Sequence, residues 1–138
     1  MQIRDVMSTA VVVMPPESAL GDIARRMRDE DIGSIPIAEN DRLVGMVTDR
    51  DLVIRALADG ADIRSLDARA VMSPEILYCR EDQTVEEVLT NMGDRQVRRL
   101  PVVDRDKRLV GMVSLGDLSR AQAKKAGDAL KDISQPGH

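Results

Sequence analysis

The sequence predicts an α+β fold made of two similar halves, and three observations carry this prediction. The hexamer RLVGMV occurs at residues 42–47 and again at 108–113. The tetrapeptide DVMS at residues 5–8 has a counterpart, AVMS, at residues 70–73. Each half also contains one apolar stripe with the i, i+3, i+4, i+7 spacing of an amphipathic helix. Such self-similarity along the chain indicates two copies of one structural unit.

Each half is predicted to follow the same order of elements: an extended run, an amphipathic helix, a strand, a polar turn, the hexamer strand and a second helix. In the first half, the extended run, helix stripe, strands and second helix fall at residues 10–14, 20–27, 34–38, 42–47 and 51–60. In the second half they fall at residues 75–79, 85–92, 99–103, 108–113 and 117–130. The two stripes are Leu20, Ile23, Ala24 and Met27, and Val85, Val88, Leu89 and Met92.

The chain of 138 residues is divided by this repeat into residues 1–65, residues 66–125 and a C-terminal helix end with a tail at 126–138. A half of about 60 residues buries only a marginal core by itself. We therefore expect the two halves to pack with pseudo-two-fold symmetry rather than to fold as independent domains.

The composition excludes several classes of function. A net charge of −4 and a single aromatic residue argue against nucleic-acid binding, for which one basic cluster is the only support. That cluster comprises Arg95, Arg98, Arg99, Arg105, Lys107 and Arg108. No apolar run has the length of a membrane span, and the first ten residues lack the apolar stretch of a signal peptide, so we expect a cytoplasmic protein that does not bind membranes.

The inventory of reactive side chains is equally short. His138 is the only histidine and Cys79 the only cysteine. A zinc site of the Cys/His kind needs ligands that this chain lacks. A catalytic Ser-His-Asp or Cys-His pair would have to use His138, the last residue of the predicted tail. We therefore expect a protein that is not an enzyme, holds no metal and requires no cofactor.

Each hexamer leads into a hydroxyl residue with an aspartate three positions later, in TDRD and SLGD. One interpretation is helix capping, in which Thr48 or Ser114 is the N-cap and Asp51 or Asp117 reaches back to it. The other is a nucleotide site, in which the helix start binds phosphate and the carboxylate accepts hydrogen bonds from ribose hydroxyls. Spacing alone does not separate the two, and both can hold together.

The whole pattern resembles a tandem pair of CBS domains, or Bateman module. The matching segments are DVMS, the helix stripe, DIGSIPI and RLVGMVTDRDL in the first half, and AVMS, QVRRLPVVD and RLVGMVSLGDL in the second. The chain is also similar to small stand-alone proteins that consist of little besides this pair. The resemblance implies two repeats, each a three-stranded sheet with two helices. It also implies a non-catalytic sensor that binds AMP, ADP, ATP or S-adenosylmethionine between the repeats.

The resemblance further implies two ligand clefts, each combining one Ser/Thr-x-x-Asp motif with strands of the other repeat. The first set is Thr48, Arg50, Asp51, Ser73, Ile76, Tyr78, Arg98, Arg99, Leu100 and Pro101. The second set is Ser8, Ala10, Val12, Ser34, Ile35, Pro36, Ser114 and Asp117. The first set is predicted to be the favoured phosphate site, because arginine suits phosphate and this set contains three arginines.

Two further predictions concern partners. The resemblance implies a homodimer, since related proteins commonly form disc-like dimers, and a regulatory module needs an effector protein that the sequence does not identify. The alternative function is a structural or protein-interaction module whose clefts stay empty, with the two motifs serving only as helix caps.

Overall fold

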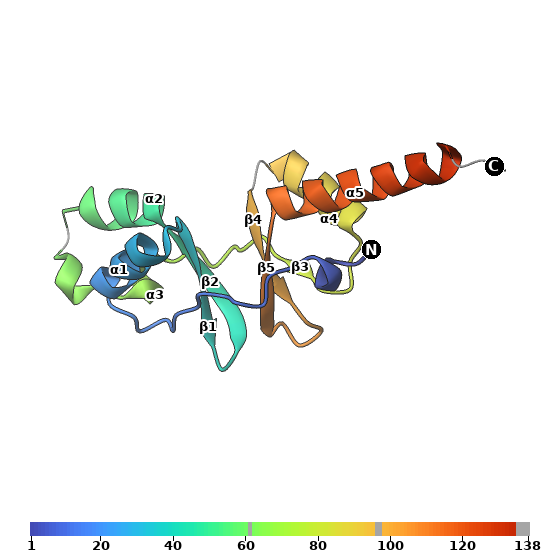
Figure 1. The fold of residues 1–138 in the computed structure, drawn as a ribbon. Helices are drawn as coiled ribbons and strands as arrows, with labels where there is room; N and C mark the ends of the chain where they lie inside the picture. Colours follow the sequence, from blue (N-terminus) through green and yellow to red (C-terminus); the bar gives the residue numbers. More distant parts are fainter. Residues whose placement is uncertain (61, 96–97, 135–138) are drawn as a thin grey trace. The chain divides into compact units, whose positions relative to one another are not determined.

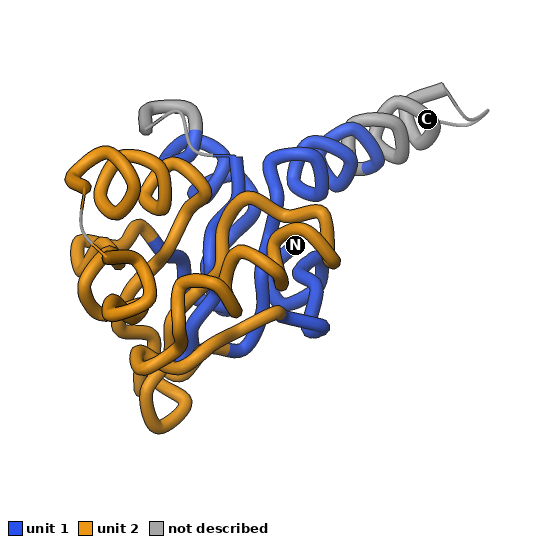
Figure 2. The backbone as a smooth tube through the Cα atoms, turned by 90° about the vertical axis from the view of Figure 1, so that its left-hand side faces the viewer, with its two compact units in different colours: residues 1–11, 78–105, 110–138 blue, residues 12–77, 106–109 orange. Residues whose placement is uncertain are grey.

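The computed structural model describes residues 1–60, 62–95 and 98–134, and the chain divides into two compact units (Figure 2). Unit 1 comprises residues 1–11, 78–105 and 110–138, and unit 2 comprises residues 12–77 and 106–109. Each unit therefore combines most of one sequence half with a segment of the other half. The N-terminal segment folds with the second half because Ile3 is fully buried in the core of unit 1.

Unit 2 begins with a long helix, followed by a hairpin and a series of short helices (Figure 1). Its elements are α1 (Leu20–Glu30), β1 (Ser34–Glu39), β2 (Arg42–Thr48), α2 (Asp49–Asp51), the π-helical η2 (Leu52–Leu57), the 3-10 helix η3 (Ile63–Ser65) and α3 (Ala68–Val71). β1 and β2 are antiparallel, and Glu39 pairs with Arg42 across a two-residue turn. Asn40 and Asp41 both have positive φ there, which a tight hairpin turn requires and which these residue types tolerate.

The stripe predicted on the first helix covers the core of unit 2. Leu20, Ile23 and Met27 are buried together with hydrophobic side chains of both strands, whereas Ala24 is exposed. Ala68 and Val71 of α3 complete this core although they belong to the second sequence half.

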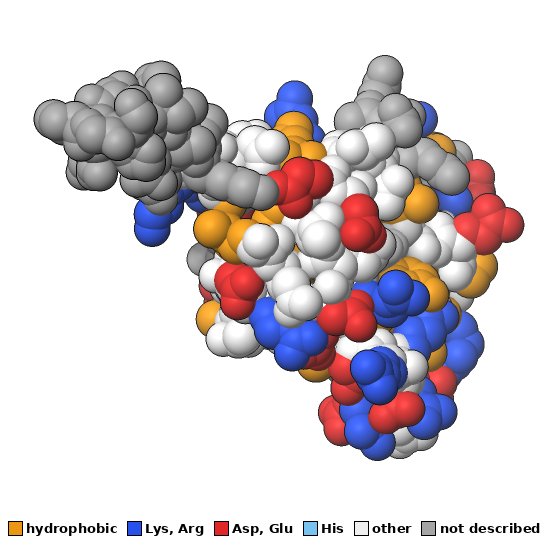
Figure 3. All heavy atoms as spheres, turned by 90° about the vertical axis from the view of Figure 1, so that its right-hand side faces the viewer, with side chains coloured by type: hydrophobic (Ala, Val, Ile, Leu, Met, Phe, Trp, Pro, Cys, Tyr) orange, Lys and Arg blue, Asp and Glu red, His pale blue; other side chains and the backbone are white. Residues whose placement is uncertain are grey.

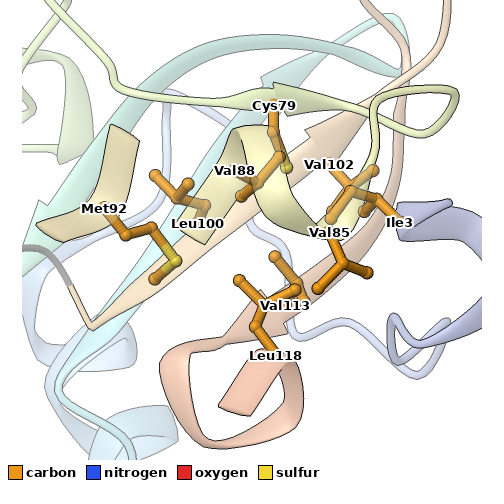
Figure 4. Close-up of a cluster of buried hydrophobic side chains, with 9 residues drawn as sticks. All are labelled: Ile3, Cys79, Val85, Val88, Met92, Leu100, Val102, Val113 and Leu118. Atoms are coloured by element: carbon orange, nitrogen blue, oxygen red, sulfur yellow. The ribbon is translucent and has the colours of Figure 1, made fainter. Parts of the chain in front are cut away.

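Unit 1 consists of a short N-terminal helix, a three-stranded sheet and two long helices (Figure 1). Its elements are the 3-10 helix η1 (Ile3–Asp5), β3 (Cys79–Arg80), α4 (Val85–Arg95), β4 (Arg99–Val103), β5 (Leu109–Ser114) and α5 (Leu115–Ser134), with β4 in the middle of the sheet. Figure 4 shows the core, in which side chains of η1, α4, α5 and all three strands meet. The tail is predicted at residues 126–138, of which 135–138 lie outside the described residues.

The two units repeat the same contacts with exchanged segments. In unit 1, Ser8 forms an antiparallel bridge with Met112, and its N–H donates to the Met112 carbonyl over 2.8 Å. In unit 2, Ser73 forms the equivalent bridge with Met46, with a distance of 2.9 Å. The VMS segment of each sequence half thus pairs with the hexamer strand of the other half, which explains why the compact units do not follow the sequence halves.

The third strand differs between the units. In unit 1, Cys79 pairs in parallel with Val102, and the N–H of Glu81 continues this ladder by donating to Val103. In unit 2 the predicted extended run at residues 10–14 contributes only the parallel bridge between Met14 and Ile37. Pro15 and Pro16 stand at the positions of Arg80 and Glu81, and proline has no N–H with which to extend the ladder.

Candidate functional site

The Thr48 motif forms a complete capping box at the end of β2. The N–H of Asp51 donates to Thr48 Oγ1 over 3.1 Å, and the N–H of Thr48 donates to Asp51 Oδ2 over 2.9 Å. Two backbone donors that the helix start leaves unpaired are satisfied in this way. The helix-cap interpretation is confirmed here.

The Ser114 motif has the same geometry at the start of α5. The N–H of Asp117 donates to Ser114 Oγ over 3.0 Å, and the N–H of Ser114 donates to Asp117 Oδ2 over 3.2 Å. Each carboxylate is therefore held in a fixed orientation by a backbone hydrogen bond to one of its two oxygen atoms.

The second oxygen of each carboxylate faces an arginine that sequence reasoning missed. Arg55 Nε lies 3.6 Å from Asp51 Oδ1, and Arg120 Nη2 lies 2.6 Å from Asp117 Oδ1. The arginine side chains are 51% and 75% exposed, so these pairs contribute little and open easily. The spacing of three or four residues after the aspartate was a usable signal for both. Each motif thus presents a preoriented carboxylate with one oxygen that a ligand hydroxyl can reach.

The glycine of each hexamer is required by a methionine that lies over it. A Cβ atom on Gly45 would stand 2.5 Å from Met72 Sδ, and one on Gly111 would stand 2.7 Å from Met7 Sδ. Glycine allows the VMS segment to approach the hexamer strand closely. This approach brings Ser73 beside β2 in unit 2 and Ser8 beside β5 in unit 1.

Both predicted ligand sets draw on both units. Of the first set, unit 2 holds Thr48, Arg50, Asp51, Ser73 and Ile76, whereas unit 1 holds Tyr78, Arg98, Arg99, Leu100 and Pro101. Of the second set, unit 1 holds Ser8, Ala10, Ser114 and Asp117, whereas unit 2 holds Val12, Ser34, Ile35 and Pro36. Within single units, the structure brings Thr48, Asp51 and Ser73 together at the end of β2, and Ser8, Ser114 and Asp117 together at the end of β5.

Several of these side chains belong to the cores. Ile35 is fully buried and Leu100 is 5% exposed, so each can offer a ligand only its main chain. Pro36 and Pro101 are buried as well, and the Pro36 carbonyl accepts a hydrogen bond from Met14 N. Tyr78, by contrast, is 45% exposed.

The two caps also differ in the residue that precedes the strand beside them. In unit 1, the N–H of Leu115 donates to the Arg98 carbonyl over 2.7 Å, which puts a basic residue next to the Ser114 cap. In unit 2, the equivalent bond runs from Asp49 N to the Gly33 carbonyl, and the Asp49 carboxylate lies against Gly33. Arg98 in unit 1 thus stands where unit 2 has Gly33, and Leu115 stands where unit 2 has Asp49.

The remaining reactive groups are few. Cys79 is 3% exposed, and burial raises the pKa of its thiol to about 12, which keeps it protonated and unreactive. Among residues 1–60, 62–95 and 98–134, no group of three or more His, Cys, Asp or Glu side chains could hold a metal ion, and His138 lies outside these residues. In the same residues, no helix is long and apolar enough to span a membrane. Figure 3 shows one face of the molecule, on which acidic and basic side chains are interspersed.

The comparisons with known proteins agree with this architecture. The CBS domain model matches residues 3–57 and 68–124. The chain is 37% identical over 134 residues to the CBS domain-containing protein YhcV of Bacillus subtilis. This alignment covers 96% of this chain and 94% of YhcV. It is 40% identical over 118 residues to Hypoxic response protein 1 of Mycobacterium tuberculosis. The aligned residues cover 85% of this chain and 82% of that relative.

Solved structures give the same result. The crystal structure of Hypoxic Response Protein I with two coordinated zinc ions matches with a TM-score of 0.79 and 38% identity, over 88% of this chain and 98% of that one. The CBS domain pair of MJ0100, solved with 5′-methylthioadenosine and S-adenosyl-L-methionine, matches with a TM-score of 0.76 and 25% identity, over 91% and 98% of the two chains. With two matched repeats, two capped hexamer strands and relatives that align along most of their length, the chain belongs to the CBS domain family as a tandem pair.

Proposed function

We propose that the chain is a non-catalytic cytoplasmic sensor that binds an adenosine-containing ligand at its two Ser/Thr-x-x-Asp motifs and signals to a partner by a change of conformation. The ligand is AMP, ADP, ATP or S-adenosylmethionine. A ligand changes the signal only if it prefers one of two conformations, so the two states must differ at these motifs.

One observation carries the proposal: Asp51 and Asp117 are each held by one oxygen through a backbone N–H, while the other oxygen faces only an exposed arginine. A carboxylate in this state is preorganised to accept hydrogen bonds from the two hydroxyls of a ribose. The MJ0100 domain pair, which binds two adenosyl compounds, supports the choice of ligand.

Thermal unfolding with each of the four ligands tests this proposal. A ligand present at 100 times its dissociation constant stabilises the folded state by about 2.7 kcal/mol. We expect Asp51→Asn or Asp117→Asn to reduce the shift, because the amide is a weaker acceptor for ribose hydroxyls. No shift with any of the four would contradict the proposal.

A structural or protein-interaction module is the second candidate, and a specific observation favours it. Both capping boxes are complete without a ligand, and no buried side-chain nitrogen or oxygen in the described part of the chain lacks a hydrogen-bond partner. Motifs that serve only as caps would give ligand-independent unfolding temperatures, with Asp51→Asn and Asp117→Asn destabilising the protein equally with and without nucleotide.

The homodimer and the effector protein are also part of the proposal. Val53, Ile54 and Leu57 of η2 are 53%, 48% and 64% exposed, a cluster of apolar side chains that association with a second copy would cover. Sedimentation velocity tests this: we expect a dimer that Leu57→Lys weakens, whereas a monomer over the whole concentration range would contradict it.

A further inference from the structure

Each unit places one methionine sulfur against the main chain of its hexamer strand. The sulfur is the atom nearest to the place of the missing Cβ in both cases, at 2.5 Å for Met72 over Gly45 and 2.7 Å for Met7 over Gly111. An atom added to either sulfur on this side would therefore collide with the strand.

Each of these methionines stands between a buried anchor and a main-chain bridge. The N–H of Met7 donates to the Ile3 carbonyl over 3.0 Å, and the N–H of Met72 donates to the Ala68 carbonyl over 2.8 Å. Ile3 and Ala68 are both fully buried. The residue that follows each methionine forms the bridge to the hexamer strand. A change at the sulfur therefore acts on the bridge, while the anchor stays in the core.

The burial of the two side chains allows a small oxidant to reach them. Met7 and Met72 are half-buried, and each packs against the core of its unit. Met27, Met92 and Met112, by contrast, are 7% exposed or less. Oxidation of a thioether to a sulfoxide turns a flexible apolar side chain into a polar one and disrupts packing. Met7 and Met72 combine access to water with contact to main chain, so this change has a large effect there.

We propose that Met7 and Met72 are oxidation-sensitive sites, at which hydrogen peroxide loosens the VMS segments from the hexamer strands. A lone pair of the sulfur attacks one peroxide oxygen and the O–O bond breaks. The proton of the transferred oxygen passes to the departing hydroxide, which leaves one sulfoxide and one water. The sulfoxide oxygen has no room beside the glycine and is better solvated by water, so the side chain turns away from the strand.

The inference goes beyond the proposed function, because the sulfur chemistry needs no ligand. Only one consequence rests on that function. Ser8 and Ser73 follow the two methionines and belong to the predicted ligand sets, so loosening the VMS segments should also weaken the binding of AMP.

Peroxide treatment of the folded protein, followed by peptide mass spectrometry and thermal unfolding, tests the proposal. We expect Met7 and Met72 to become sulfoxides before the three buried methionines do. The unfolding temperature should fall by about 5–10 °C as they react, because the altered side chains no longer fit over the glycines.

A pair of double variants assigns this fall to the two sites. Met7→Leu/Met72→Leu removes both sulfur atoms at nearly constant volume and should change by less than about 2 °C on treatment. Met14→Leu/Met46→Leu is the matched control, since these side chains are equally half-buried and neither is among the atoms nearest to a described glycine. This control should lose as much stability as the native protein. If the first variant is unstable before treatment, the single variants replace it, and each should lose about half of the native shift.

Two results would overturn the proposal: Met7 and Met72 that stay unoxidised in the folded protein, or an equal fall of the unfolding temperature in the two double variants. Calorimetry with AMP before and after treatment tests the consequence for the ligand. Unchanged affinity in a destabilised protein would keep the oxidation sites and overturn their link to binding. A protein that binds no AMP even before treatment would count against the proposed function and leave the thermal result valid.

Discussion

Unit 1 and unit 2 build the same arrangement of strands and helices from different sequences, and comparing them shows which features the fold requires. Both contain a capped helix after a hexamer strand, and both bridge that strand to a VMS segment. They differ in the third strand, which prolines cut short in unit 2, and in the charges around the caps. The shared features are structural requirements, whereas unit 2 forms the same capping box and the same bridge without the charges that unit 1 alone carries.

The exchanged segments do not contribute equally to the two cores. Ile3 is fully buried in unit 1, whereas its counterpart in unit 2 is the much smaller Ala68. Unit 1 therefore depends more strongly on the segment that it takes from the other sequence half.

The largest expected effect comes from Ile3→Ala. Removing this buried side chain should lower the free energy of unfolding by about 2–5 kcal/mol, through lost burial and the cavity left behind. Urea denaturation measures the change, and Arg4→Ala, at a neighbouring exposed position, should change it by less than about 0.5 kcal/mol. Equal effects of the two variants would mean that the N-terminal segment does not stabilise unit 1.

The next largest effect is expected from alanine at the hexamer glycines, where the loss of stability should differ between the two units. Gly111→Ala would bring a Cβ to 2.9 Å from the main-chain oxygen of Ser8, which cannot move freely, so we expect a loss of about 1–3 kcal/mol. The three atoms nearest to a Cβ on Gly45 all belong to the side chain of Met72, which is flexible, so Gly45→Ala should cost less. Thermal unfolding compares them, with Gly21→Ala on the exposed face of α1 as a stabilising control of about 0.5–1 kcal/mol. Equal losses at Gly45 and Gly111 would contradict the asymmetry.

The two caps should respond alike. Thr48→Ala and Ser114→Ala each remove an N-cap hydroxyl, which should cost about 1 kcal/mol in the absence of ligand. Chemical denaturation of the free protein measures both, and Thr48→Ser keeps the hydroxyl as the control. A cost at only one position would show that one of the two caps is not a structural requirement.

The smallest expected effect is the contribution of Cys79 to the pH dependence of stability. The pKa of the Cys79 thiol is raised from 9.0 to about 12 in the folded chain, so the unfolded chain loses this proton first as the pH rises. Stability should be unaffected by Cys79 below pH 9 and should fall between pH 9 and 12, by on the order of 1 kcal/mol at pH 10. Met14 occupies the equivalent position in unit 2 and does not titrate.

Denaturation of the native protein and of Cys79→Val at pH 8 and pH 10 isolates this contribution, because all other groups titrate in both. Identical pH dependence of the two proteins would show that Cys79 ionises as readily in the folded state as in the unfolded one.

Much of this protein was determined by its sequence alone. The hexamer strands and, except for the exposed Ala24, the helix stripes follow the sequence prediction, and the caps are one of the two interpretations that the spacing allowed. Each of these features depends on residues within about one turn or one strand of each other. The methionines that lie over the hexamer glycines, by contrast, are far from them in the sequence and were not predicted.

Only the tertiary structure decided which segment joins which unit. DVMS and AVMS are nearly identical, so local sequence does not indicate which core each one enters; the packing of Ile3 against residues more than 75 positions away does. Unit 1 likewise has a pocket that needs the N-terminal segment and α5 together, because Asp5 lines it with Arg120 and Lys124, which lie more than 110 residues further along the chain. Contacts of that separation arise from packing of the whole chain, and periodicity and spacing do not encode them.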